Sequence, residues 1–377
     1  MLIEKEEKRS DRYRNVLFRS STEKPFAKRV PVSHRARAAK NCLILDNGFF
    51  REEAASIGSE LSRCDIMSFS EALEQYGIVI EDKIQKLADH DPDHFVRMNA
   101  RESGDGLFIF FPKHFCLSEP LYIDLRFEEG VKAFPKLFFF LSEGVEIECI
   151  MNIYGAKELS LNMLTMLIQE KRSRMRCVSL THASERSEVF TGLRAQLKQD
   201  AVLSMQEFSR GALFLRRDLH AELEEAGAAV DFSGCDILDG TFQANSYVKV
   251  DHKAPDTLSK QLFKATLAGH ARSSFEGLIC VHRGASRTDA YQMSRAVLLS
   301  EEAKAFIKPN LEVYQDDVKA SHGATIARLG LEERTYLAMR GIGPEDAVRL
   351  LVRGHLEEMV HKAPPVFQKE VEAFYEK

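Results

Sequence analysis

The middle of the chain is a long series of short apolar runs, many of which alternate apolar with polar residues. Alternation with a period of two is typical of strands that bury one face. Small residues such as Gly211, Gly227 and Gly240 separate the runs from about residue 105 to 325. The runs are 107–111, 121–123, 145–149, 159–163, 201–205, 213–215, 229–232, 247–250, 278–281 and 311–314. The pattern predicts a mainly β region of many short strands.

The two ends of the chain follow a helical period instead. Ser68 and Glu71 have the spacing of a capping box, and Asp91–Pro92 has the N-cap and first-turn proline of a second helix. Near the C-terminus, Gly343–Pro344 precedes apolar residues that recur at helical spacing between 348 and 360. We interpret most of that stripe as core, with a part left over as an interaction face.

Few architectures accommodate about two hundred residues of short strands without long helices between them. A sandwich or barrel would need many hairpin signals, and the region contains only Asp105–Gly106 and Asp239–Gly240. A parallel β-helix stacks short strands through corners and coils, so the pattern favours this fold. The predicted organisation is a mostly helical region over 1–104, a parallel β-helix core over 105–325 and a helical domain over 326–377.

Composition and charge exclude several classes of protein. The 377 residues are 44% hydrophobic and 29% charged, with a formal charge of -5, which does not suit a surface that coats nucleic acid. No apolar run approaches the roughly 18 residues of a membrane span, and residues 4–9 are charged rather than an export signal. We therefore expect no membrane role and a cytoplasmic location. The basic stretch 19–37, with its two prolines, is expected to be a mobile arm.

Recognisable catalytic and cofactor motifs are absent from the sequence. It has no GxxxxGK[ST] loop, no GxGxxG after a strand, no GxSxG and no HExxH, so we expect no nucleotide bound through a P-loop. The seven cysteines form no CxxC pair, which excludes a self-contained cysteine cluster and suits a reducing compartment. Cys280 is interpreted as a small buried hydrophobe. His220, His270 and His282 lie in strand-like stretches, where a structural role is favoured.

The densest polar constellation lies between Asp316 and Thr325. Asp316, Asp317, a lysine, a serine and His322 fall within seven residues, which suits acid–base chemistry or metal ligation. In a strand, Ala320 and His322 would share one face, and Gly323 would allow the backbone to turn. One histidine with two carboxylates is an incomplete metal site, so further ligands would come from elsewhere, such as another chain. A solvated turn remains an equal alternative on these residues alone.

Several motifs between about 250 and 342 resemble the core of the SufB/SufD family of the SUF iron–sulfur assembly scaffold. They are Ser273–Gly277, Thr288–Gln292, Arg295, Leu298–Ser300, Lys308–Pro309, Leu311–Tyr314, Asp316–Thr325, Tyr336–Leu337 and Arg340–Ile342, with 105–125 and His252–Pro255 as weaker matches. The aspartate pair followed by Ser-His-Gly-Ala-Thr resembles the D subunit rather than the B subunit.

The resemblance implies a right-handed parallel β-helix between helical ends, acting as a non-catalytic scaffold rather than an enzyme. It further implies pairing with a B-type paralogue (SufB-like) and with an ABC-type ATPase (SufC-like) that docks on the C-terminal helices. A transient iron–sulfur cluster or iron would form at the subunit interface, with His322 as the ligand from this chain. Many relatives carry a cysteine two residues before this histidine, where this sequence has Ala320. Asp316 and Asp317 are interpreted as structural rather than as ligands.

Two other readings remain open from the sequence. Acidic pairs such as Asp316–Asp317 along a β-helix groove are compatible with a carbohydrate-active enzyme. Such an enzyme would expose tryptophan and tyrosine to sugars, and this chain has no Trp and nine Tyr. A stand-alone homodimer, formed by pairing of exposed strand edges, is the third reading.

Overall fold

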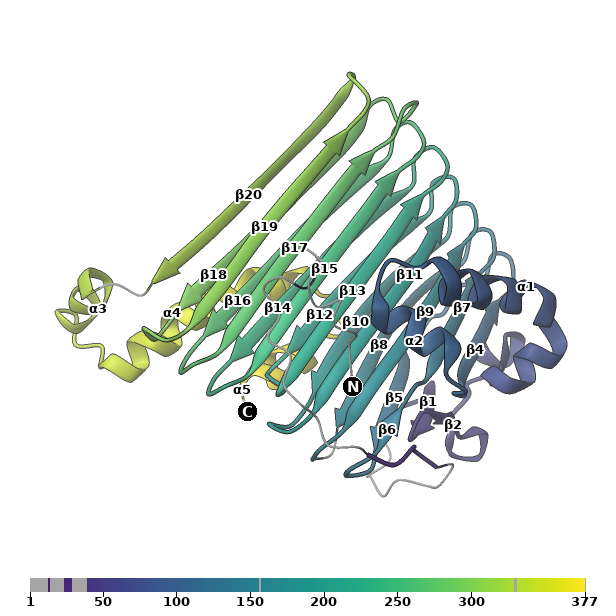
Figure 1. Ribbon diagram of the computed structural model, residues 1–377, viewed down its shortest axis with the longest axis horizontal. Coiled ribbons are helices and arrows are strands. Elements are labelled where there is room, and N and C mark those ends of the chain that lie inside the picture. Colours follow the sequence, from purple (N-terminus) through teal and green to yellow (C-terminus); the bar gives the residue numbers. More distant parts are fainter. Residues whose placement is uncertain (1–12, 14–23, 29–38, 156, 329–330, 377) are drawn as a thin grey trace.

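The computed structural model describes residues 13, 24–28, 39–155, 157–328 and 331–376, and the predicted mobile arm lies largely outside these ranges. Two ten-stranded sheets dominate the molecule (Figure 1). The even sheet has the order β2-β1-β5-β8-β10-β12-β14-β16-β18-β20, and the odd sheet has the order β19-β17-β15-β13-β11-β9-β7-β4-β3. Because successive strands alternate between the sheets from β7 onward, the chain winds as a parallel β-solenoid, which confirms the predicted fold class.

The strands of the solenoid are nearly equal in length and stack in continuous parallel register. The even sheet contains β1 (Cys42–Asp46), β2 (Phe49–Phe50), β5 (Leu121–Phe127), β8 (Glu146–Gly155), β10 (Arg174–His182), β12 (Val202–Ser209), β14 (Ala229–Leu238), β16 (Leu258–Leu267), β18 (Thr288–Leu298) and β20 (Val318–Arg328). The odd sheet contains β3 (Asp65–Ser68), β4 (Gly106–Phe111), β7 (Lys136–Leu141), β9 (Ser160–Gln169), β11 (Glu188–Leu197), β13 (Phe214–Leu223), β15 (Gln243–His252), β17 (Arg272–Val281) and β19 (Lys304–Val313), with β6 (Lys132–Ala133) beside β9.

The lumen between the two sheets is the main hydrophobic core. Alternate side chains of both sheets point inward, and leucine, phenylalanine, valine and alanine fill most of this space. The outward faces carry smaller apolar clusters where helices cover them. At about 25 cal/mol per Å² of apolar surface, burial of the lumen is the largest favourable contribution to the stability of the fold.

The region over 1–104, predicted to be mostly helical, also contributes strands to the two sheets. The described part contains α1 (Phe69–His90) and α2 (His94–Arg101), but β1, β2 and β3 extend the two sheets. Every residue of β1 is buried. A short continuous apolar run has no periodicity, so the sequence pattern alone does not distinguish this strand from a buried helix.

The first helices begin where capping chemistry places them, with one correction. Ser68 caps α1 through the predicted capping box with Glu71. Asp93, not Asp91, caps α2 by accepting hydrogen bonds from the backbone N–H groups of Phe95 and Val96. Asp91 instead ends α1 and accepts a hydrogen bond from the backbone N–H of Asp93. Pro92 therefore lies between the last residue of α1 and the N-cap of α2, one position before the N-cap.

Two arginines fasten α1 and α2 to the outward face of the odd sheet. Arg194 of β11 makes a two-pronged contact with Asp91, at 2.6 and 2.7 Å, and Arg216 of β13 donates to Asp93 at 2.9 Å. Asp218 contacts both arginines, at 2.9 and 3.2 Å. The side chains of all five residues are nearly buried, so each charge has a partner where an isolated charge would be costly.

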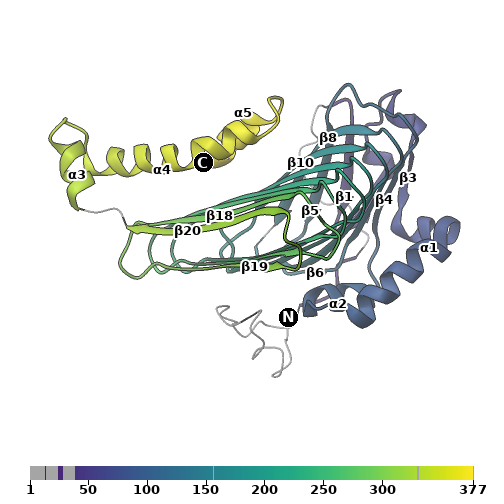
Figure 2. The same ribbon diagram turned by 90° about the horizontal axis from the view of Figure 1, so that it is seen from above.

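Two of the three C-terminal helices, α4 and α5, lie along the opposite, even sheet, and α3 lies beyond the ends of its strands (Figure 2). The three helices are α3 (Leu331–Ala338), α4 (Pro344–Lys362) and α5 (Gln368–Glu376). Gly343 is the N-cap and Pro344 opens α4, as predicted. The second half of the apolar stripe is core: Leu356, Met359 and Val360 pack with α5 against β10, β12 and β14. Among the described residues, no helix is long and apolar enough to cross a membrane.

A fully buried set of charges lies inside the lumen. Arg217 of β13 makes a two-pronged contact with Asp236 of β14, at 2.7 and 3.1 Å, and lies 3.5 Å from Glu207 of β12. The hydroxyl of Ser209 donates to Asp236 at 2.5 Å. Burial raises the pKa of Glu207 to about 7, although Arg217 and the hydroxyl of Ser179 act in the opposite direction. One arginine thus faces two carboxylates, of which Asp236 has the better geometry.

The raised pKa of Glu207 predicts a pH-dependent stability. The unfolded chain loses the Glu207 proton near the ordinary value of 4.5, whereas the folded chain keeps it to about pH 7. Stability therefore falls as pH rises from 4.5 to 7 and is constant above, with a total of about 3 kcal/mol from this group. We expect Glu207→Gln to remove this contribution, as measured by urea unfolding at pH 5 and pH 8. Equal pH dependence in both proteins would contradict the assignment.

Candidate functional site

The solenoid ends on β19 and β20, the last strands of the two sheets, and no described element covers them. Their lumen-side residues are consequently exposed or only half buried: Val313 is 43% and Ile326 49% accessible. Ile307 and Leu311 are only half buried. This surface, called the open end below, is formed by the lumen-side residues of β19 and β20. It presents apolar side chains and an unpaired strand edge of eleven residues, both of which favour association.

His322 lies on β20 at the open end and is exposed. It is in register with Gln292 of β18, and Gln292 is in register with Gln261 of β16. Both glutamines are fully buried, and the Gln292 amide donates to the Gln261 carbonyl oxygen at 2.6 Å. Because residues paired in a parallel ladder point to the same face, His322 continues an inward polar ladder to the last strand. Because no described turn stacks on β20, the His322 imidazole would face a partner that covers the open end.

A glycine on the facing sheet makes room for this ladder. A Cβ atom built on Gly277 of β17 would lie 1.8 Å from Nε2 of Gln292 and 2.9 Å from Cζ of Phe275. Only glycine at this position leaves space for the buried amide. The sequence motif Ser273–Gly277 is therefore explained by lumen packing next to the site.

Among the remaining residues of the 316–325 constellation, Asp316 and Asp317 lie in a turn, as interpreted from the sequence, and Gly323 differs from the prediction. Asp316 and Asp317 lie in the turn before β20, exposed, where the Asp317 carbonyl accepts a hydrogen bond from the backbone N–H of Arg287 at 2.6 Å. Gly323 does not turn the backbone, because β20 continues to Arg328. Its Cβ position lies 2.5 Å from Cε of Met293, so close packing of the neighbouring strand explains the glycine.

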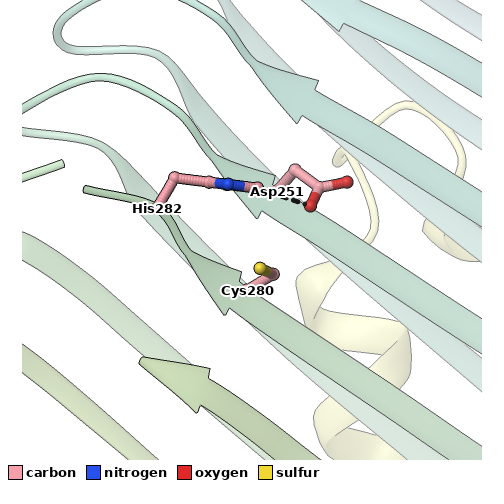
Figure 3. Close-up of side chains that lie close together, drawn as sticks. All are labelled: Asp251, Cys280 and His282. Carbon is pink, nitrogen blue, oxygen red and sulfur yellow. Dashed lines mark hydrogen bonds and ion pairs between the residues drawn. The ribbon is translucent and has the colours of Figure 1, made fainter. Parts of the chain in front are cut away.

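The structure also brings together side chains that sequence reasoning set aside. Asp251, Cys280 and His282 place potential ligand atoms within 4.8 Å of one another on the outward face of the odd sheet (Figure 3). His220, Glu222 and Asp251 form a second such group. These residues are about thirty positions apart along the chain. Aligning them from the sequence would require the length of one solenoid turn, and the sequence contains no exact repeat that gives this length.

Electrostatics in this cluster centre on Asp251. Burial acts to raise the pKa of Asp251, but hydrogen bonds from His220, Lys249 and His282 outweigh it and hold this pKa well below its usual range. Asp251 is therefore a carboxylate at neutral pH. Burial, together with the nearby carboxylates of Asp251 and Glu312, raises the pKa of Cys280 to about 11.

The fold and the open end define the chain as a parallel β-solenoid with flanking helices and a last turn that none of the described elements covers. Residues 126–355, more than half of the chain, match the family model described as SUF system FeS cluster assembly, SufBD core domain. The chain therefore belongs to the SufB/SufD family, which takes part in iron–sulfur cluster assembly. This result confirms the resemblance carried by the motifs between 250 and 342.

Individual relatives are distant. An iron–sulfur cluster assembly SufBD family protein of Synechocystis is 25% identical, over 89% of this chain and 76% of its own length. The chloroplastic protein ABCI7 of Arabidopsis thaliana is 27% identical, over 72% of this chain and 60% of its own length. The iron–sulfur cluster assembly protein SufD of Escherichia coli is 27% identical, over 58% of this chain and 52% of its own length. The matches thus span little more than half of the last two proteins.

Substituting Gly277 tests the lumen ladder beside His322. We expect Gly277→Ala to displace the Gln292 amide and to lower the free energy of unfolding by about 1–3 kcal/mol, the usual range for overpacking a core. Gly354→Ala is the matched control, because Gly354 is an exposed position of α4 and its Cβ position meets nothing within 4 Å. The control should be neutral or slightly stabilising, since alanine favours the helix. Denaturant unfolding measures both, and equal stabilities would argue against the packing role.

Proposed function

We propose that this chain is the D-type, non-catalytic scaffold subunit of a SUF iron–sulfur cluster assembly complex. The observation that carries the proposal is the open end of the solenoid, with His322 at the end of its inward ladder. Solenoids generally need a polar cap or a partner over their last turn, because each turn contacts only its neighbours. A B-type paralogue with the same architecture supplies strands and lumen residues of matching spacing.

His322 is the residue of this chain that we propose as a ligand for iron or for a nascent cluster at that interface. Its imidazole is on the side that meets the partner, and imidazole nitrogen is a suitable ligand for iron. One nitrogen does not complete a metal site, so the remaining ligands would come from the partner or the cluster. Asp316 and Asp317 are assigned to the turn before β20 rather than to ligation.

The C-terminal helices are proposed as the docking site for an ABC-type ATPase. Much of α4 and α5 is committed to the even sheet, but three apolar side chains on α3 and α4 and the turn between them are exposed: Tyr336 at 55%, Met339 at 83% and Leu350 at 51%. The Arg340 guanidinium lies 3.7 Å from the ring centre of Tyr336, which orders this surface. A partner subunit with its own nucleotide site would bind here.

The open end is tested by co-expressing the chain with a B-type paralogue. We expect Ile326→Glu and Val313→Glu to abolish the complex, because each would bury an unpaired charge at the interface. Ile78→Glu is the matched control. Ile78 is 89% exposed on α1, which packs on the outward face of the odd sheet, so this variant should form the complex normally. Light scattering of the purified protein gives the mass. Undiminished pairing by both variants would refute the proposed interface, and a stable homodimer in place of the heterocomplex would favour the stand-alone reading.

Replacing His322 separates ligation from packing. His322 is exposed in the single chain, so His322→Ala should leave folding and complex formation intact while cluster formation drops sharply. Iron and sulfide content of the co-purified complex, together with rescue of a strain that depends on this pathway, are the measurements. Normal cluster loading with the alanine variant would remove His322 from the site. Loss of the complex itself would identify a packing residue instead.

The ATPase surface is tested by point substitutions rather than by truncation. Removing the chain after Thr325 would strip α4 and α5 from the even sheet and expose the apolar cluster beneath them. Met339→Asp with Leu350→Asp changes only exposed side chains, so the fold should persist while co-purification of the ATPase falls by at least about tenfold. Ile78→Asp on α1 serves as the control. Unchanged co-purification would place the ATPase elsewhere.

A further inference from the structure

A row of ligand-type side chains crosses the outward face of the odd sheet. Glu222 of β13, Asp251 of β15, Cys280 of β17 and Glu312 of β19 are consecutive partners in register. Adjacent strands of a sheet lie about 4.8 Å apart, so side chains in such a row are neighbours. His220 and His282 lie two positions to either side of the row, on the same face. The row therefore concentrates nitrogen, sulfur and oxygen donors on one small area.

Asp251 joins these donors. Its two carboxylate oxygens receive separate contacts: Nε2 of His282 lies 2.9 Å from Oδ1, and Nε2 of His220 lies 2.5 Å from Oδ2. Cys280 is buried and lies in register with Glu312 of the next strand. Figure 3 shows the Asp251, Cys280 and His282 side chains converging from neighbouring strands.

We propose that Asp251, Cys280 and His282 bind a divalent transition-metal ion, of the borderline class that includes Zn²⁺, Co²⁺ and Fe²⁺. Thiolate, imidazole and carboxylate together suit this class, whereas Mg²⁺ and Ca²⁺ prefer oxygen alone. The ligand atoms already lie within 4.8 Å of one another, so small rotations bring all three to one ion. Binding forms the metal–sulfur bond and releases the thiol proton of Cys280 to solvent. The site is separate from His322 and does not rest on the proposed partners.

Further ligands and an entry path are also present. Glu312 is in register with Cys280 and exposed on the last strand of the odd sheet, so its carboxylate is suited to the fourth position. On the other flank, His220 and Glu222 form the second group around Asp251. These two residues also line a cleft of about 690 Å³ beneath α1, and the His282 side chain is 43% exposed, so solvent reaches both flanks of Asp251.

The competing explanation is an ordinary ion-pair network. Nζ of Lys249 lies 2.8 Å from Oδ2 of Asp251, and Nζ of Lys253 lies 2.9 Å from Oε1 of Glu222. In a purely structural network these lysines neutralise the carboxylates and no metal is needed. In a metal site, the ion replaces the Lys249 ammonium at Asp251. The two explanations therefore predict opposite effects of removing Lys249.

Titration of the isolated 377-residue chain with Co²⁺ tests the proposal. One ion should bind per chain, with a sulfur-to-cobalt charge-transfer band that Zn²⁺ displaces. Cys280→Ser should remove the band, and His282→Gln should weaken binding at least about tenfold, the minimum expected for a direct ligand. The His282 side chain is 43% exposed, so this variant should fold. Lys249→Met should tighten binding, because the competing ammonium is gone.

Matched controls keep the outcome interpretable. Cys116→Ser and His270→Ala alter an exposed thiol and an exposed imidazole outside both groups, and both should bind Co²⁺ like the unaltered chain. His322→Ala should also bind normally, which separates this site from the open end. Absence of the charge-transfer band, equal binding by Cys280→Ser, or weaker binding by Lys249→Met would overturn the proposal in favour of the ion-pair network.

Discussion

Stacking of one solenoid turn on the next is the interaction on which the rest of the structure depends. Each strand satisfies its backbone hydrogen bonds and buries its inward side chains only through the strands before and after it. On the N-terminal side of the stack, β1, β2 and β3 form the first strands, and Phe50 and Leu61 pack into the lumen core. The described residues place nothing comparable over β19 and β20. The same rule that stabilises the interior thus creates one unsatisfied surface, and the proposed function follows from it.

Stacking also explains why polar residues occur inside an apolar lumen. In a parallel sheet, the residue in register on the next strand points to the same face. A buried amide or charge can therefore pair with that neighbour while the backbone stays regular. Gln261 and Gln292 use this arrangement along one sheet, and Arg217 with Asp236 uses it between the sheets. The ladder of glutamines reaches the last strand at His322. A polar path in the lumen therefore ends at the surface that the partner is proposed to cover.

Much of the architecture was predictable because it depends on local signals. Short apolar runs, some of them alternating, marked most solenoid strands, and Ser68 and Gly343–Pro344 marked the starts of α1 and α4. Buried β1 was missed because it lacks periodicity, and the N-cap of α2 was placed on the wrong aspartate because Asp91 and Asp93 have the same chemistry. The Asp251 cluster was missed for a different reason. Its members meet only through the register of β15 and β17, which residue types and spacing do not encode.

The even sheet links the two surfaces proposed to bind partners. On its outward face, Lys264 of β16 donates to the His355 carbonyl at 2.7 Å and pairs with Glu358 at 2.8 Å, which fastens α4. On its inward face, the neighbouring strand β18 carries Gln292, next to His322. One layer of hydrogen-bonded strands therefore separates Lys264, which holds α4, from the inward ladder of glutamines that ends at His322. Because packed sheets move as rigid units rather than deforming, a displacement of α4 by a docked ATPase would reach the open end as a movement of β16, β18 and β20 together.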